Sequence, residues 1–211
     1  MDKLRRTLIT AIALLPLAAP AQSSRNGAAY STLQNHLPIE TPGKIEVAEF
    51  FWYGCIHCYN LEPLLEKWLP SLAADTRFRR IPTVFNERWG HDAVIYYAFE
   101  ALGVLDKLHR PFFDAIHRDR LKTDNPQALA EWLTKNGIDP KKLDATMKSF
   151  GVQSKVKRAA QLTAASRIDG TPALMVQGRY TISPEQGGSL QGMLSNAAAL
   201  VGSLRKNPAA R

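Results

Sequence analysis

The sequence predicts an α/β protein in which a mixed β-sheet is flanked by helices and interrupted by a block of further helices. Three observations lead to this prediction. A strand, a helix and a second strand follow one another over residues 44–84, residues 92–166 carry helical patterns only, and a hairpin and a helix end the chain. A strand–helix–strand unit makes two strands parallel and a hairpin makes two antiparallel, so the sheet is expected to be mixed.

The composition is that of an ordinary globular protein, with 45% hydrophobic and 22% charged residues in a chain of 211. A chain of this length forms one or two domains and can bury a core without disulfide staples. The formal net charge is +8. Its basic side chains are scattered and not interleaved with stacking aromatic residues, so we expect no nucleic-acid binding.

The first 21 residues contain the three parts of a secretory signal peptide. Basic side chains within residues 3–6 precede an apolar stretch from Leu8 to Ala19, and residues 19–21 fit a cleavage site before Gln22. The apolar stretch is shorter than the roughly 20 residues that span a bilayer, which disfavours a retained anchor. Cleavage removes three basic side chains and one acidic side chain, so the net charge falls from +8 to +6. Export places the protein where disulfides form and persist.

The elements of the first half of the sheet follow from runs of β-branched and aromatic residues. Residues 30–33 are expected to form a short strand, and residues 44–52 a buried one. Apolar residues at helical spacing from Leu61 to Leu69 predict a helix that opens at two cysteines. Residues 77–84 predict the next strand, with a break or an edge at Pro82.

The helical block is divided by proline and glycine. Residues 85–91 are expected to form an exposed loop. A capping residue before a proline at the first helical position is a strong start signal, and glycine a stop signal. The expected helices begin near His91 or Asp92, at Pro111, at Pro126 (ending at Gly137), at Pro140 (closing at Gly151) and at Val152.

The end of the chain returns to the sheet. Residues 173–176 and 179–182 predict two strands joined by the turn Gln177-Gly178, which is a hairpin. Residues 183–186 have the form of a capping box with proline in the first turn. We therefore expect one last helix from 184 to about 202.

The two cysteines of the chain, Cys55 and Cys58, lie together where the first long strand passes into its helix. The thiolate is the reactive form of cysteine, and the unpaired N–H groups and dipole at a helix start favour negative charge. The pKa of Cys55 should therefore be lowered, and Cys58 lies one turn further in. We predict that Cys55 is the exposed attacking sulfur and Cys58 the shielded resolving one.

Three other interpretations of the cysteine pair are weaker. A structural bridge that closes so short a loop constrains the unfolded chain little. A metal site needs further ligands, which the remaining histidines do not supply at a clear spacing, and haem attachment needs histidine where this chain has Tyr59. We predict a redox pair and no metal site. His57, beside Cys55, can stabilise the reduced thiolate, which makes the disulfide a stronger oxidant.

Residues around this pair resemble the DsbA family of periplasmic thiol:disulfide oxidoreductases. The resemblance rests on the downstream pair Thr171-Pro172 and on the run Glu49-Phe50-Phe51-Trp52-Tyr53-Gly54-Cys55-Ile56-His57-Cys58-Tyr59. It covers the whole mature chain in element order and implies a thioredoxin-like mixed sheet flanked by helices with an inserted all-helical domain. The implied division is a signal peptide (1–21), a thioredoxin-like domain (22–88 and 167–211) and an inserted helical domain (89–166).

The resemblance also implies roles for single residues. Thr171 and Pro172 would form the loop that faces the disulfide, with a cis peptide bond, and Glu49 would be a buried acid below the site. A charge that faces water at the strand end is the alternative for Glu49. Many members of the family have proline where this chain has Ile56, a difference that bears on the redox potential. Substrate contacts are expected from Ile56, Trp52 and the Thr171-Pro172 loop.

The predicted function is a dithiol oxidase of exported proteins that uses no cofactor besides its Cys55–Cys58 disulfide. The partners implied by the resemblance are unfolded exported proteins with free thiols and a membrane, quinone-linked DsbB-type protein that reoxidises the pair. We expect a monomer in the periplasm of a Gram-negative bacterium. The alternatives are a periplasmic reductase or isomerase, a thiol copper chaperone and a non-catalytic binding protein.

Overall fold

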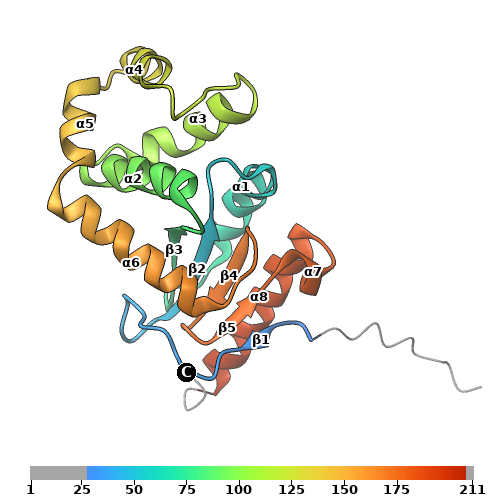
Figure 1. Ribbon diagram of the computed structural model, residues 1–211. Helices are drawn as coiled ribbons and strands as arrows, with labels where there is room; N and C mark the ends of the chain where they lie inside the picture. Colours follow the sequence, from blue (N-terminus) through green and yellow to red (C-terminus); the bar gives the residue numbers. More distant parts are fainter. Residues whose placement is uncertain (1–27, 208–211) are drawn as a thin grey trace, which may run out of the picture.

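The computed structural model describes residues 28–207, so the predicted signal peptide lies outside the described residues. One five-stranded sheet runs in the order β1-β5-β4-β2-β3 (Figure 1). The strands β2 and β3 pair in parallel and the other neighbours pair antiparallel, which confirms the mixed sheet. The strands are β1 (Ser31–Thr32), β2 (Ile45–Phe51), β3 (Thr76–Pro82), β4 (Ala173–Val176) and β5 (Tyr180–Ile182).

Strand β2 is the centre of the sheet, and all seven of its residues are buried. Its side chains alternate between the two faces. Val47 packs in the apolar cluster with helices α1 (Ile56–Trp68) and α8 (Leu190–Lys206), whereas Phe50 packs in the cluster with α6 (Phe150–Ser166). Burial on both faces explains the run of β-branched and aromatic residues that leads to the cysteines.

Five helices follow β3 with no strand among them: α2 (Glu87–Ala101), α3 (Leu105–His117), α4 (Pro126–Lys135), α5 (Pro140–Met147) and α6. In Figure 1, α2 to α5 cover the end of the sheet at which α1 begins, and α6 returns along one face. The apolar core of this block includes Phe51, Tyr53 and Cys58. The cysteine pair therefore lies where the sheet and the helical block meet. No helix within residues 28–207 has the length and apolar character that a membrane span needs.

Two predicted helix starts in this block are wrong. Helix α2 begins at Glu87 rather than near His91 or Asp92, because the Asn86 side chain caps it by accepting a hydrogen bond from the Trp89 N–H. Helix α3 begins at Leu105, so Pro111 lies inside the helix instead of opening it. Buried apolar residues on both sides of Pro111 hold this helix against the core.

Two predicted glycine positions also differ. Gly151 lies inside α6 and does not close the preceding helix, because Ser149 caps α6 at that point. The last predicted helix is two helices. The capping box over Ser183–Gln186 is confirmed, but α7 (Pro184–Gly187) ends at Gly188, whose φ is +69°, and α8 starts after a new cap. The strand boundaries differ from the predicted ones by at most two residues.

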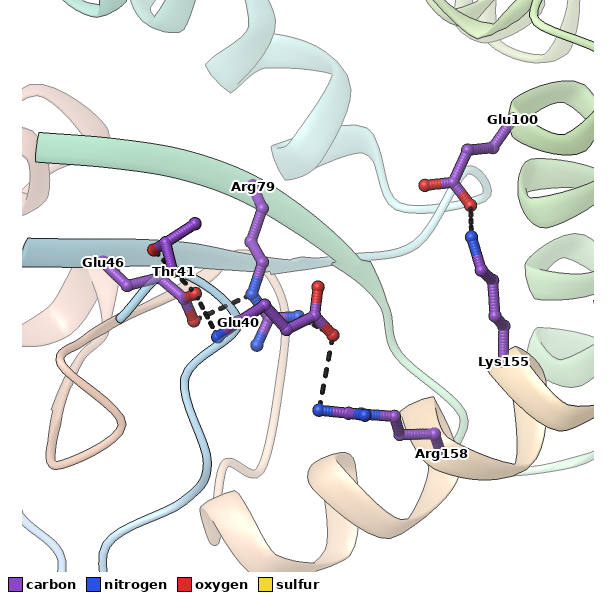
Figure 2. Close-up of polar contacts among 7 residues, drawn as sticks. All are labelled: Glu40, Thr41, Glu46, Arg79, Glu100, Lys155 and Arg158. Carbon is purple, nitrogen blue, oxygen red and sulfur yellow. Dashed lines mark hydrogen bonds and ion pairs between the residues drawn. The ribbon is translucent and has the colours of Figure 1, made fainter. Parts of the chain in front are cut away.

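Ion pairs lie where the helical block meets the sheet (Figure 2). Glu40, in the segment before β2, lies 3.5 Å from Arg79 on β3 and 3.5 Å from Arg158 on α6. Lys155 on α6 pairs with Glu100 on α2 at 2.6 Å. All five side chains line one cavity of about 270 Å³ between these elements. Such exposed pairs contribute little each, so the apolar contacts of α6 hold the two parts together.

We expect Gly178→Ala to lower the free energy of unfolding by more than Gly43→Ala does. Both glycines have positive φ, +62° and +83°, where a side chain costs about 1 kcal/mol. A methyl group at Gly178 would also overlap the carbonyl oxygen of Leu37, for a further cost of about 1–3 kcal/mol, whereas the described residues leave Gly43 open space. Chemical denaturation of both variants tests this, and equal losses would contradict it.

Candidate active site

The turn between β2 and α1 places Cys55 at the N-cap of α1. The Cys55 N–H donates to the carbonyl oxygen of Trp52 at 3.0 Å, which closes a tight turn. Gly54 is required in this turn, because a Cβ at that position would overlap the indole ring of Trp52. The strand–turn–helix setting predicted for the cysteines is therefore confirmed.

The two sulfurs lie in opposite environments. Cys55 is half-buried and Cys58 fully buried, and both are free thiols in the structure. A hydrogen bond from the Cys58 thiol lowers the pKa of Cys55 to about 5, with help from Thr171 and from the backbone N–H groups of Cys58 and His57, which together outweigh burial. Burial, followed by the proximity of Cys55 and Glu49, raises the pKa of Cys58 well above its ordinary value. At neutral pH, Cys55 is a thiolate and Cys58 a thiol.

The loop at Thr171 and Pro172 lies against Cys55 although 116 residues separate them. The peptide bond between Thr171 and Pro172 is cis, and the carbonyl oxygen of Thr171 lies 3.2 Å from the sulfur of Cys55, from which it accepts a hydrogen bond only while Cys55 is protonated. His57 is exposed and lines a cavity of about 430 Å³ together with this loop. Ile56 is 48% exposed at the helix start. The structure thus brings Cys55, His57, Thr171 and Pro172 together.

Glu49 is fully buried, so the alternative of a strand-end charge that faces water is wrong. Its side chain lies on the face of β2 that α1 covers. The Nε of Arg80 is 3.1 Å from Oε2 of Glu49, but the pair lacks the alignment of a hydrogen bond. Burial raises the pKa of Glu49 to about 8, and the charge of Arg80 opposes this only in part. Glu49 is therefore largely protonated at neutral pH.

A buried polar chain continues from Arg80, and the sequence analysis missed all of it. Nη2 of Arg80 contacts both carboxylate oxygens of Glu62 at 3.1 and 3.0 Å. Glu62 Oε1 is 3.3 Å from His109 Nε2, and His109 Nδ1 is 2.9 Å from the Tyr53 hydroxyl. A carboxylate on the apolar face of α1, one turn after Cys58, was the available signal for Glu62. Nothing local marks Arg80, because the pairing of β3 with β2 brings it to Glu49.

Trp52 is held from the side of the helical block. Its Nε1 donates to Oδ2 of the buried Asp92 at 2.8 Å, and its ring stacks on Trp89 with 4.3 Å between centroids. Asp92 also accepts from Thr123 at 2.6 Å, so its position is fixed. Phe85, 43% exposed, packs on Trp89. The sequence analysis missed Asp92, a charge within the apolar face of α2.

Comparisons with known proteins agree with this site. The family model described as a DSBA-like thioredoxin domain matches residues 80–189. The thiol:disulfide interchange protein DsbA of Azotobacter vinelandii is 39% identical over 175 residues, which are 83% of this chain and 82% of that protein. The chain belongs to the DsbA family. It is thus a thiol:disulfide oxidoreductase.

Solved structures of DsbA proteins share the fold. The crystal structure of Pseudomonas aeruginosa DsbA has a TM-score of 0.80 and 34% identity, and the match covers 85% of this chain and 94% of that one. The oxidoreductase NmDsbA1 of Neisseria meningitidis has a TM-score of 0.75 and 30% identity, over 87% of this chain and 95% of that one. These matches confirm the DsbA-type thioredoxin-like fold with a helical insertion.

In the reduced protein we expect thiolate absorbance to titrate with a midpoint of about 5, below the ordinary value of 9.0. Cys55→Ser should abolish this transition. Cys58→Ala should raise the midpoint, because it removes the main donor to the thiolate, and Cys58→Ser should raise it less, because serine retains a donor. Ultraviolet absorbance against pH measures all four proteins. A wild-type midpoint near 9 would refute the expected charge state.

Glu49→Gln should stabilise the reduced protein more as pH rises. An acid whose pKa is raised by folding contributes its stability at pH values below its pKa in the unfolded chain. This stability is lost as the pH rises through its pKa in the folded protein. For Glu49 the window runs from 4.5 to about 8. We expect the variant and wild type to have similar free energies of unfolding at low pH and the variant to be the more stable above pH 8. Urea unfolding over this range tests it, with the exposed Glu66→Gln as control, and parallel curves for Glu49→Gln would contradict it.

Proposed function

We propose that this protein donates its active-site disulfide to newly exported proteins, with Cys55 as the attacked sulfur and the shielded Cys58 as the leaving one. The supporting observation is the opposite pKa shifts of two thiols one helical turn apart. A sulfur that is stable as a thiolate is a good leaving group, and whatever stabilises the reduced thiolate makes the disulfide a stronger oxidant. Both effects favour oxidation of the substrate over its reduction.

In the first step a substrate thiolate attacks Cys55 in the disulfide form. A bond forms between the substrate sulfur and Cys55, the Cys55–Cys58 bond breaks, and the electron pair leaves on Cys58. Burial disfavours a thiolate at Cys58, so this sulfur needs a proton. Glu49, buried and largely protonated, is the proposed donor.

In the second step another thiol of the substrate loses its proton and attacks the substrate sulfur of the mixed disulfide. The bond to Cys55 breaks, and Cys55 leaves as the thiolate. The substrate has then lost two electrons and two protons, and the enzyme holds a thiolate at Cys55 and a thiol at Cys58. One of the two protons restores Glu49 to its protonated form, and the other goes to the solvent. The pKa of Cys55, about 5, favours this departure.

Substrate contact is proposed for the surfaces beside Cys55. The cavity lined by Thr171 and Pro172 adjoins the sulfur, and extended chain can pair with exposed backbone there. Ile56 and Trp52 offer apolar surface with little sequence preference. For His57 we propose that the ring stabilises the Cys55 thiolate, a role that its exposed place two residues after Cys55, at the start of α1, supports.

The predicted signal peptide and the family support a setting in the periplasm, where a DsbB-type membrane partner would reoxidise the pair. We further propose that the protein is a monomer with two domains. Residues 22–88 and 167–211 form the thioredoxin-like domain, and residues 89–166 form the inserted helical domain. No soluble cofactor enters the proposed transfer, because the disulfide itself carries the two electrons.

We expect the oxidised protein to form disulfides in a reduced, unfolded substrate. Cys55→Ser and Cys58→Ser should both lose this activity, because neither variant can form the Cys55–Cys58 disulfide. Mixed instead with a disulfide-containing substrate, Cys58→Ser should accumulate the mixed disulfide on Cys55, because no second enzyme thiol can release it. Substrate oxidation is followed by thiol titration and the mixed disulfide by non-reducing electrophoresis. Equilibration of the wild type with glutathione supplies the second measurement. A strongly reducing equilibrium would refute the oxidase and favour the reductase or isomerase.

The copper chaperone is tested by the same variants. In residues 28–207 no three His, Cys, Asp or Glu side chains are grouped as for a metal ion. We expect the wild type to oxidise substrate thiols without added copper, whatever Cu(I) its two reduced cysteines bind, and the Cys55→Ser variant to lose this oxidation. Tight binding that requires both cysteines, together with absent substrate oxidation, would favour the chaperone.

A further inference from the structure

The buried site below the cysteines holds two carboxylates and one guanidinium. Glu49 and Glu62 are 0% and 3% exposed, and both face Arg80. One positive charge compensates one buried carboxylate, and a second ionised carboxylate would be left uncompensated in a medium of low dielectric constant. One of the two therefore carries a proton at neutral pH. The contacts around each carboxylate decide which one.

The hydrogen bonds favour ionisation of Glu62. Its two oxygens accept from Nη2 of Arg80, and Oε1 is also 3.3 Å from His109. Burial alone would raise the pKa of Glu62, but His109 and Arg80 hold it below its ordinary value. Neither oxygen of Glu49 has a hydrogen-bond partner among the described residues, although Arg80 lies 3.1 Å away.

The protonation state of His109 follows from its two neighbours. Burial raises the pKa of Tyr53, so its hydroxyl is protonated and can donate to Nδ1 of His109. Burial also lowers the pKa of His109, so the ring is neutral and carries one hydrogen. With Nδ1 accepting from Tyr53, that hydrogen is on Nε2, where it donates to the Glu62 carboxylate.

We infer that His109 is a positioning residue that keeps the negative charge on Glu62 and thereby keeps the proton on Glu49. The inference rests on the proposed function, in which Glu49 supplies that proton to Cys58. His109 lies on α3, so the inserted helical block helps to determine which of the two buried carboxyl groups below the cysteines carries the proton. This role explains why an ionisable ring lies in an apolar cluster with Phe51 and Phe113.

The other charged or titratable groups around His109 and Glu49 stay in place when His109 is substituted. His109 is faced by Tyr53 after β2, Glu62 on α1, Arg80 on β3, Tyr96 on α2 and Arg110 on α3. Glu49 is faced by Arg80, Glu62, Cys55 and Cys58. A substitution at His109 therefore changes one donor to Glu62 and adds no charge.

The test compares His109→Leu with His109→Gln in the full chain, without its signal peptide. Infrared spectroscopy against pH locates the protonated carboxyl group, whose band is assigned by its loss in Glu49→Gln or Glu62→Gln. In the wild type at pH 7 we expect the band to belong to Glu49. Loss of a hydrogen bond to a charged group changes such an equilibrium about tenfold or more. His109→Leu should therefore move protonation toward Glu62 by about that factor.

His109→Gln should retain the wild-type distribution, because its amide N–H can replace Nε2–H and cannot titrate. The rate of the first step, measured with a small thiol and the oxidised enzyme, should fall in His109→Leu at pH 7 and be rescued in His109→Gln. A purely structural role would lower the stability of both variants and leave the Glu49 band in place. An unchanged band and pH profile in His109→Leu would overturn the inference.

Tyr53→Phe provides the second variant if His109→Leu does not fold. It keeps the aromatic packing and removes the donor to Nδ1, so the hydrogen is no longer fixed on Nε2, and we expect a smaller shift in the same direction. An unchanged Glu49 band in this variant would also overturn the inference. If the wild type fails to oxidise substrate but protonation still shifts from Glu49 to Glu62 in the His109→Leu or Tyr53→Phe variant, the proposed function is refuted and the role of His109 is not.

Discussion

The difference in environment between two sulfurs one helical turn apart is the constraint that the rest of the structure serves. Cys55 needs hydrogen-bond donors and access from outside, whereas Cys58 needs burial. The helix start at the end of a fully buried strand supplies the first, and the apolar core of the helical block supplies the second. The position of α1 between sheet and block makes both available to residues only three apart.

The inserted block contacts the active-site turn from two directions. From outside, Asp92 of α2 holds the indole of Trp52, which lies over Gly54. From beneath, His109 of α3 contacts Tyr53 in the same turn and Glu62 in α1. The block therefore contributes both to the shape of the turn and to the charges below it.

Much of the fold could be predicted because its causes are local. The buried strand β2, the caps before Pro126 and Pro140 and the box at Ser183 are readable from neighbouring residues. The errors at Pro111 and Gly151 arose because packing and a serine cap outweighed the usual effect of proline and glycine. The cysteine pair could likewise be predicted from neighbouring residues. Arg80, however, meets Glu49 only through the register of β2 and β3, which cannot be predicted from local sequence.

The short loop between Cys55 and Cys58 affects how much the disulfide stabilises the folded protein. A disulfide across so short a loop restricts the unfolded chain little, so the oxidised form gains little stability from it. The reduced form gains the thiolate interactions at the start of α1, which an unfolded chain lacks. In the thermodynamic cycle that joins folding to reduction, the folded state is therefore more stable with the bridge open. Transfer of the disulfide to a substrate protein therefore increases the stability of the folded enzyme.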